Sequence, residues 1–303
     1  MLPKLEGYAA ALLGTLDAAD LTTVASDLVA LEQTVLTRAD LRGVLADTSI
    51  AGPVRGVIVR ELLAGKVADT TSRLAVFAAT MVPAQEVPRA IGELNQGAHH
   101  LVETGAIEQS NLGLLGARKR VGGFADAILE DLATDDFAAI EHELFTWART
   151  IEENQELRRL LVDRDASLDA RLAVTDQLLS DRVSAATLAL ARYVIIGGRP
   201  RDVVGTLDFL VDHVAEARNW RVARVHSARA LNEQDQIDLA RSLSALTGGS
   251  VELQIAEEPE LLGGVLVEVG DLRLDATTRG RLSTLRDAVA SGHFYESALK
   301  QND

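Results

Sequence analysis

The candidate metal ligands and general acid/base residues in this sequence are its 6 His and 45 Asp or Glu residues, and the chain has no Cys. A metal site would therefore need imidazole and carboxylate ligands alone. The histidines are scattered along the chain, and the adjacent pair His99 and His100 would point to different sides of a helix. This spacing indicates no metal centre.

The carboxylates form no evident general acid/base pair. Glu141, His142 and Glu143 fall on one polar face of a predicted helix, where we expect them to be solvated. Asp135 and Asp136 fall near the start of that helix, where the macrodipole favours negative charge. The sequence also contains no Gly-x-Gly-x-x-Gly motif and no Gly-rich loop ending in Lys-Ser or Lys-Thr. We therefore expect no cofactor and no enzymatic activity.

The composition of the chain limits the fold classes and the kinds of partner to be expected. The chain has 303 residues, with 47% hydrophobic but only 4% aromatic residues, which predicts Leu, Val and Ala cores of the kind that favour helix packing. A formal charge of −15 argues against nucleic acid and anionic lipid as partners. There is no signal-peptide pattern, and no apolar run approaches the ~20 residues that span a bilayer. We expect no direct membrane insertion.

An internal repeat organises the helical part of the chain. Residues 7–102 align without a gap on residues 123–218 at a constant offset of 116. The shared positions are mostly the apolar ones of a helical period, and they include Thr71 with Thr187. We interpret this pattern as a duplicated helical domain.

Each copy contains the pattern of six helices with short connections. In the second copy, Asn154, Ser167 and Ser184 stand where side chains could cap helices, and Gly197 with Gly198 would end the fifth helix. Six helices joined by short connections predict a compact bundle of mostly antiparallel neighbours.

The pattern changes after residue 218 to that of a mixed domain. Alternating apolar residues predict strands over 220–227 and 251–255, with a helix from 232 to 247 between them. A third strand over 265–269 and a return strand from 272 would form a hairpin, followed by a last helix.

The expected fold is therefore mainly α with a C-terminal α+β domain, that is, two tandem six-helix bundles followed by a small β-α-β-β-α domain. We place the first bundle at 1–104, a connector at 105–122, the second bundle at 123–218, the α+β domain at 219–290 and a polar tail at 291–303. The connector carries one basic cluster, Arg118 to Arg120, which we interpret as a solvated turn or a contact to an acidic partner.

Residues near the C-terminus resemble the signature of the delta (OSCP) subunits of F-type ATP synthases. That pattern has Gly-Gly before a valine-rich strand, Gly-Asp after it, then Asp followed by Arg and spaced leucines. The matching residues are Gly263, Gly264, Gly270, Asp271, Asp275, Arg279 and Leu282. Ala276-Thr277 departs mildly from the family's Gly-Ser.

The resemblance covers residue 123 to about residue 290. The additional first copy is similar to the enlarged delta subunits of actinobacteria, some of which are fused behind a membrane-anchored b segment. No such anchor stands in this sequence, so we expect an unfused chain or a fragment.

The resemblance implies a non-catalytic stator subunit at the cytoplasmic face of the cell membrane, peripheral through the synthase complex. In that family the bundle grips N-terminal helices of alpha subunits, the C-terminal domain holds b-type stalk helices, and the subunit resists rotor torque during proton-driven ATP synthesis. We expect an alpha helix to dock between the first and fifth helices of the second copy. The candidate residues, which could equally be ordinary core, are Phe124, Ile128, Leu188 and Ile195.

The alternative function is a free helical adaptor or regulatory protein. This alternative shares the predicted bundles, but it does not account for the Gly-Gly strand or for the segment from Asp275 to Leu282.

Overall fold

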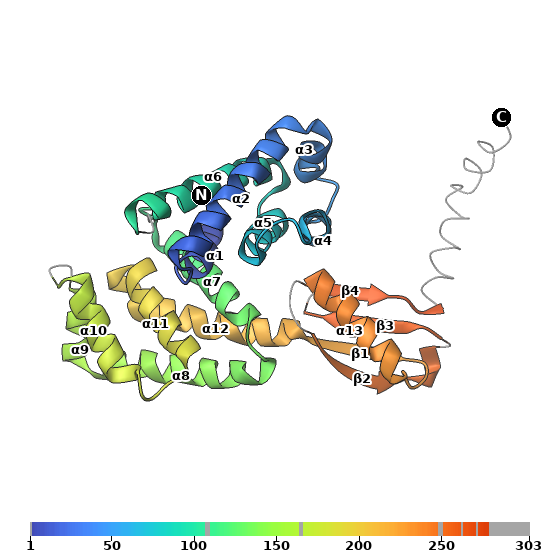
Figure 1. The fold of residues 1–303 in the computed structure, drawn as a ribbon. Coiled ribbons are helices and arrows are strands. Elements are labelled where there is room, and N and C mark those ends of the chain that lie inside the picture. The colour runs from blue at the N-terminus through green and yellow to red at the C-terminus, as the bar shows by residue number, and fades with distance from the viewer. Residues whose placement is uncertain are drawn as a thin grey trace. The chain divides into compact units, whose positions relative to one another are not determined.

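The computed structural model describes residues 2–106, 110–163, 166–247, 251–261, 263–270 and 272–278. The chain divides into two compact units, Met1–Ala215 (unit 1) and Glu216–Asp303 (unit 2). The described part of unit 1 is helical, and unit 2 carries a four-stranded sheet (Figure 1). The expectation of a mainly helical chain with a small mixed sheet near its C-terminus is confirmed.

Two sets of helices follow one another in chain order, and we call them the first and second repeats. The first repeat consists of α1 (Pro3–Leu13), α2 (Ala18–Thr37), α3 (Ala39–Ala46), α4 (Gly52–Leu63), α5 (Asp69–Met81), the 3-10 turn η1 (Ala84–Glu86) and α6 (Val87–Thr104). The second repeat consists of α7 (Leu114–Glu130), α8 (Thr134–Glu153), α9 (Gln155–Val162), α10 (Leu168–Leu179), α11 (Ala185–Gly197), η2 (Pro200–Asp202) and α12 (Val203–Arg221).

The bounds of these elements repeat at the offset seen in the sequence. Adding 116 to the bounds of α2, α3, α4, α5 and η1 gives the bounds of α8, α9, α10, α11 and η2. The expected caps are also present, because Asn154, Ser167 and Ser184 each accept a hydrogen bond from a backbone N–H in the first turn of the helix that follows.

Two helices extend further than expected. The predicted connector over 105–122 is helical from Leu114, where α7 begins. α12 continues through Arg221, so the first strand starts at Val222 rather than at residue 220. The sequence signals at both places were local glycines or alternating residues, and helix propagation from the neighbouring turns overrides them.

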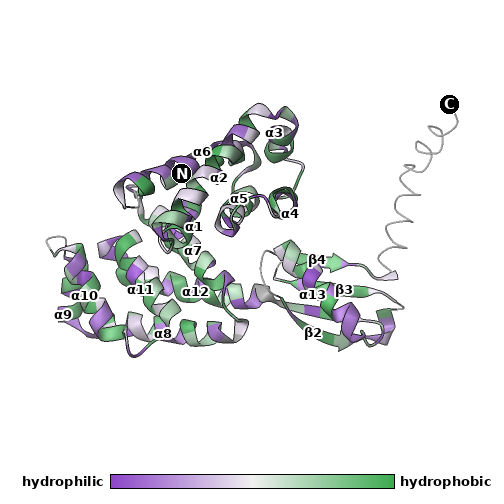
Figure 2. Cartoon of the chain, viewed as in Figure 1, coloured by the Kyte–Doolittle hydropathy of each residue, from purple (hydrophilic) through white to green (hydrophobic). Residues whose placement is uncertain are grey.

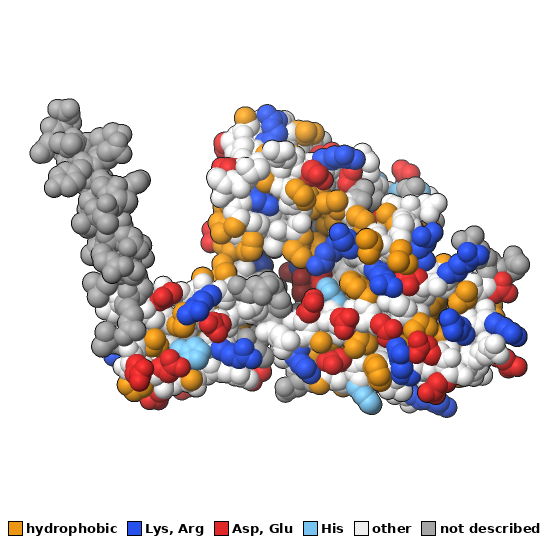
Figure 3. Space-filling model, turned by 180° about the vertical axis from the view of Figure 1, so that it is seen from behind, with side chains coloured by type: hydrophobic (Ala, Val, Ile, Leu, Met, Phe, Trp, Pro, Cys, Tyr) orange, Lys and Arg blue, Asp and Glu red, His pale blue; other side chains and the backbone are white. Residues whose placement is uncertain are grey.

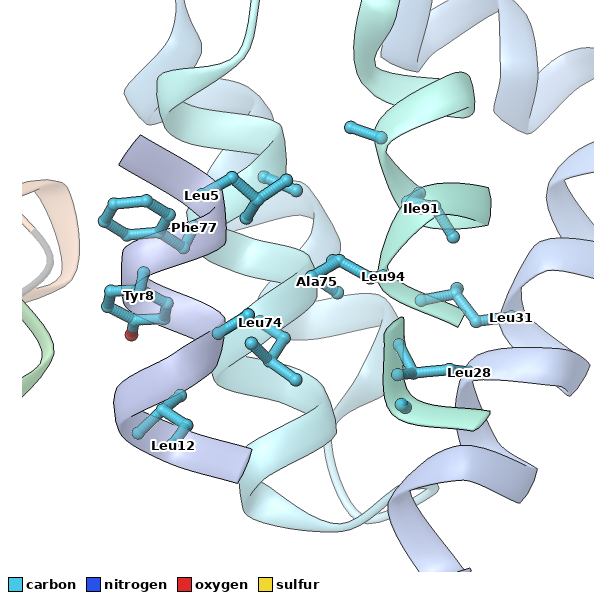
Figure 4. Packing of buried hydrophobic residues seen from close by; sticks show 14 of the residues in the cluster. Leu5, Tyr8, Leu12, Leu28, Leu31, Leu74, Ala75, Phe77, Ile91 and Leu94 are labelled. Carbon is cyan, nitrogen blue, oxygen red and sulfur yellow. The ribbon is translucent and has the colours of Figure 1, made fainter. Parts of the chain in front are cut away.

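The core of the first repeat is built mostly from aliphatic side chains, with one aromatic pair at its edge. Figure 4 shows Tyr8 and Leu5 of α1 beside Leu74 and Phe77 of α5, with Leu94 of α6 on the far side of Leu74 from Tyr8. All of these side chains are buried. Full burial of one such side chain contributes roughly 1.5–3 kcal/mol, so this layer holds α1, α5 and α6 together.

Unit 2 is a sheet with one helix. Its elements are β1 (Val222–Ser227), α13 (Glu233–Thr247), β2 (Glu252–Glu257), the 3-10 turn η3 (Pro259–Leu261), β3 (Val265–Val269) and β4 (Leu272–Asp275). The strand order is β2-β1-β3-β4, with β1 and β2 parallel and the other two pairs antiparallel. Val225 pairs with Val267 in the buried layer beneath Leu243. β1, α13 and β2 follow one another in the order β-α-β, and β3 pairs antiparallel with β4. The expected last helix lies outside the described residues.

Hydrophobic and hydrophilic residues are interleaved along the helices (Figure 2). Within the described ranges, no helix combines the length and the apolar character needed to cross a bilayer.

Candidate partner-binding site

The opening helices of the two repeats, α1 and α7, cross at a pair of equivalent glycines. A Cβ atom on Gly7 would lie 1.7 Å from the carbonyl oxygen of Arg120, and one on Gly123 would lie 1.9 Å from that of Lys4. Lys4 and Arg120 are also related by the offset of 116. The two helix backbones are therefore in direct contact, and the contacts are related by an approximate two-fold axis. Only glycine allows backbones to approach this closely.

A carboxylate ties the second helix to the fifth helix in both repeats. Each carboxylate accepts hydrogen bonds from a backbone N–H that precedes the fifth helix and from a threonine hydroxyl in its first turn. The equivalent sets are Asp27 with Ala68 and Thr71, and Glu143 with Ser184 and Thr187. Because the partners are equivalent one by one, the repeat is present in the hydrogen bonds as well as in the sequence.

The expectation that Glu143 is solvated is therefore wrong. Its Oε2 atom lies 2.6 Å from the hydroxyl of Thr187 and 3.1 Å from the backbone nitrogen of Ser184. Burial acts to raise the pKa of Glu143, but the hydrogen bonds from Thr187 and Ser184 outweigh it and hold the pKa below its usual value. The backbone N–H of Ser184 and the hydroxyls of Ser184 and Thr187 supply the hydrogen bonds that solvent was expected to supply.

An aromatic pair joins the first and fifth helices of each repeat. Tyr8 stacks on Phe77 with ring centroids 3.7 Å apart, and Phe124 stacks on Tyr193 at 3.8 Å. These four residues are equivalent in pairs, with the hydroxyl exchanged between the partners. Burial raises the pKa of both Tyr8 and Tyr193. Phe124 is thus fixed against α11 by the same contact that fixes α1 against α5.

The C-terminal end of α7 contacts both α1 and α5 of the first repeat. Tyr8 Oη donates to Glu130 Oε2 at 2.6 Å, and Arg73 Nη2 donates to the same oxygen at 3.0 Å. Arg73 Nη1 also reaches Asp131 at 3.1 Å, and Ala127 of α7 belongs to the core of the first repeat. Burial raises the pKa of Glu130, and the bonds from Tyr8 and Arg73 only partly oppose this effect.

A buried ion pair lies beside the glycine crossing. Arg120 Nη1 donates to Glu6 Oε1 at 2.8 Å, and the two side chains are 5% and 6% exposed. Arg120 also donates to the carbonyl oxygens of Gly197 and Ser110, while the Ser110 N–H donates to Glu6 Oε1 at 2.9 Å. The network joins both repeats and the segment between them.

The solvated reading of the basic cluster is therefore wrong for Arg120. Arg118 is also paired, through two bonds of 2.8 Å to Asp202 in η2. The reason is that α7 begins at Leu114, so the cluster lies on a packed helix rather than in a turn. Sequence reasoning missed the pair between Glu6 and Arg120, since nothing local connects residues so far apart in the chain.

The four candidate docking residues lie on two helices that pack together, Phe124 and Ile128 on α7, and Leu188 and Ile195 on α11. Ile195 is only 4% exposed and belongs to the interior. Phe124 is partly buried, packing against the first-repeat core as well as on Tyr193. Ile128 and Leu188 have the same intermediate exposure as Phe124.

The glycines of the C-terminal signature adopt backbone conformations that favour glycine. Gly264 has φ of 81°, and a Cβ atom there would lie 2.4 Å from the carbonyl oxygen of Ala276. Gly263 has φ of 143° and Gly270, in the turn between β3 and β4, has φ of 55°. All three positions favour glycine over residues with a side chain.

Asp275 ends β4 with a local turn. Its Oδ1 atom accepts from the backbone N–H of Thr277 at 2.9 Å and from the Thr277 hydroxyl at 2.6 Å. These hydrogen bonds, the side-chain one first, lower the pKa of Asp275. The other signature residues, Asp271, Arg279 and Leu282, lie outside the described residues.

The described histidines that contact carboxylates do so singly. His213 Nε2 lies 2.6 Å from Asp126, and His226 Nδ1 lies 2.7 Å from Glu258. In the described part of the chain, no three His, Asp or Glu side chains converge as metal ligands would. The hydrogen bonds and ion pairs described above for unit 1 therefore join its helices to one another.

Comparison with known families decides which proteins these features belong to. The sequence model of the ATP synthase delta (OSCP) subunit matches residues 122–289, which take in most of α7, the rest of the second repeat and the sheet of unit 2. The chain belongs to the ATP synthase delta (OSCP) subunit family. It is accordingly a structural, non-catalytic subunit of ATP synthase.

Relatives of the delta family span both repeats. The chain is 31% identical over 287 residues to ATP synthase subunit delta of Nocardia farcinica, covering 94% of this chain and 95% of the relative. It is 29% identical over 266 residues to that of Salinispora arenicola, covering 88% of each chain. The duplicated length is therefore shared with other delta subunits.

A chain from the cryo-EM structure of the Toxoplasma gondii mitochondrial ATP synthase hexamer is also similar. It matches 56% of this chain and 97% of its own length, with 16% sequence identity and a TM-score of 0.25. The TM-score is too low for this likeness to bear on the fold.

Proposed function

We propose that this delta-family subunit links the catalytic head of an F-type ATP synthase to its peripheral stalk, holding N-terminal helices of alpha subunits and the b-type stalk helices. The observation that carries this proposal is the contact of α1 with α7. The helices meet backbone to backbone at Gly7 and Gly123, and the buried pair of Glu6 and Arg120 lies beside them. A contact with no flexible side chains between the backbones suits a part that must resist torque.

Each repeat is proposed to be a six-helix bundle, with a connector between the two bundles. The equal bounds of five elements and the equivalent carboxylate ties support this assignment. The second bundle and the α+β domain form the part that resembles an ordinary delta subunit, since the family match starts at residue 122.

The alpha helix is proposed to dock on α7 and α11 of the second repeat. Phe124, Ile128 and Leu188 are apolar and partly exposed there, whereas Ile195 is buried. An amphipathic helix recognises such a face through apolar residues spaced at i, i+3 or i+4, and i+7.

Unit 2 is assigned to the b-type helices, following the division of labour in the family. Acidic, basic and hydrophobic side chains are interspersed on the face seen in Figure 3, a composition compatible with protein partners. With both partners bound, the subunit would sit at the cytoplasmic face of the cell membrane, held there through the complex.

Reconstitution tests the proposal. The full chain is mixed with a head lacking its delta subunit and with b-type stalk protein, and captured complexes are analysed by mass spectrometry. We expect the full chain to bring head and stalk together, and a chain ending at Arg221 to keep the head and lose the stalk. A full chain that captures neither partner would contradict the linking role.

A further inference from the structure

Four arginines lie around the contact between α9 and η2, and we call them the arginine cluster. Two belong to α9, and two flank the first residue of η2. The members are Arg158, Arg159, Arg199 and Arg201, and all four side chains are exposed. Four positive charges therefore meet at one place on a chain whose formal charge is −15.

The acidic residues around the cluster do not neutralise it. Asp202, the acidic residue of η2 itself, accepts two hydrogen bonds of 2.8 Å from Arg118 and a third from the Thr206 hydroxyl. Among the residues that the structure describes, no ion pair involves a member of the cluster. Glu156 in the first turn of α9 and Asp163 just after this helix are the exposed acidic residues nearest in sequence, so positive charge remains in excess.

The fold does not require these charges, as the first repeat shows. There α3 packs against η1 as α9 packs against η2, and the bounds of both elements agree at the offset of 116. The positions equivalent to the cluster are Arg42, Gly43, Pro83 and Gln85. The contact thus forms with one arginine, and this arginine donates to the carbonyl oxygen of Leu36 at 2.9 Å. Three of the four charges of the second repeat therefore serve a purpose other than folding.

We propose that the arginine cluster binds an acidic segment of another subunit of ATP synthase. Membership of the delta (OSCP) family makes the other subunits of that complex the partners of this chain. A guanidinium forms paired hydrogen bonds with a carboxylate and is more weakly hydrated than an ammonium, which is why arginine is common in interfaces. The surface uses α9 and η2, so the inference does not depend on a helix docking on α7 and α11.

Reconstitution with variants of the full chain tests the proposal. The chain is added back to ATP synthase stripped of its delta subunit, and affinity is measured from about 0.05 M to about 0.5 M salt. We expect Arg158→Gln with Arg159→Gln, and separately Arg199→Gln with Arg201→Gln, to weaken binding about tenfold at low salt. At high salt the variants should converge on the parent, because salt screens contacts between exposed charges. A salt dependence that is the same in parent and variants would overturn the inference.

Arg42→Gln combined with Arg182→Gln is the matched control. It changes the net charge by the same amount, and both side chains are exposed. Arg42 is the repeat equivalent of Arg158, while Arg182 precedes the start of α11, one helix length of about 20 Å from Arg199 at its other end. We expect the affinity of this control to stay within about twofold of the parent. An equal loss in control and cluster variants would mean that only net charge matters, and would overturn the inference.

A second measurement uses the native complex without any variant. Purified synthase and the free chain are treated with phenylglyoxal, which modifies accessible guanidinium groups, and the modified peptides are quantified by mass spectrometry. We expect the members of the cluster to react several-fold more slowly in the complex than in the free chain. Equal rates would overturn the inference, as would protection that is lost when bound lipid is exchanged for detergent. Protected arginines in a chain that fails to link head and stalk would instead contradict the proposed function alone.

Discussion

Glu6 and Arg120 form a buried ion pair of 2.8 Å between the opening helices of the two repeats. Neither helix can leave the other without exposing a charge that now faces its opposite in the interior. The pair adjoins the crossing at Gly7 and Gly123, so polar and backbone contacts coincide at one joint. Unit 1 is held at this joint as one compact body that contains both repeats.

Breaking the ion pair should destabilise unit 1 strongly. Arg120→Ala leaves Glu6 buried without its partner, and such single deletions cost about 3–5 kcal/mol of unfolding free energy. Urea denaturation followed by circular dichroism measures the loss. Replacing both residues with Met should cost much less, because no charge is left buried.

Arg118→Ala is the matched control for that prediction. Arg118 pairs with Asp202, but its side chain is 28% exposed. Partly exposed pairs contribute about 1 kcal/mol or less, so the variant should denature close to the parent. Equal losses for Arg118→Ala and Arg120→Ala would show that burial of the pair is not what matters.

A methyl group at the glycine crossing should also destabilise unit 1. The Cβ atom added by Gly7→Ala would meet a backbone carbonyl at 1.7 Å, and the resulting shift should cost about 1–3 kcal/mol. Gly43→Ala is the control, since Gly43 lies in α3 with nothing within 4 Å of the added atom. That variant should gain about 0.5–1 kcal/mol from helix propensity. Thermal melts of the two variants should therefore move in opposite directions.

Local signals in the sequence predicted the elements of this fold well. Asn154, Ser167 and Ser184 cap the helices that they were expected to cap, because an N-cap depends only on residues within one turn. Strand alternation located β1, β2 and β3, and the Gly-Gly and Gly-Asp pairs located the hairpin. The constant offset of 116 predicted the equal helix bounds.

The contacts between the two repeats could not be predicted from local sequence patterns. Gly7 and Gly123 were part of the alignment, but a repeat does not say which face of one copy meets the other. The sequence indicates a solvated turn or a contact to an acidic partner for the basic cluster that contains Arg120, and nothing in it points to Glu6, which is 114 residues away. The docking residues on α7 and α11 remain a prediction.

The carboxylate tie at the start of α11 should give unit 1 an acid-sensitive contribution. The pKa of Glu143 lies below its usual value of 4.5, so the stabilisation that it provides is present above that pH and is lost as the pH falls through the lowered pKa. Glu143→Gln should lower the unfolding free energy at pH 7, and the difference from the parent should shrink in acid. Urea titrations from pH 7 to about pH 3 measure this convergence. A difference that stays constant over the range would contradict the role of the charge.

In unit 2, Gly264 and Gly270 should differ in how they tolerate a side chain. Gly264→Ala combines a positive φ of 81° with a contact of 2.4 Å to the carbonyl oxygen of Ala276, so the backbone that directly follows β4 must shift. Gly270→Asn requires only a left-handed conformation, which Asn adopts readily, so its cost should be below about 1 kcal/mol. Hydrogen exchange of the β3 and β4 amides should accelerate at least tenfold in Gly264→Ala and little in Gly270→Asn. Similar protection in both variants would mean that the approach of Ala276 does not require glycine at position 264.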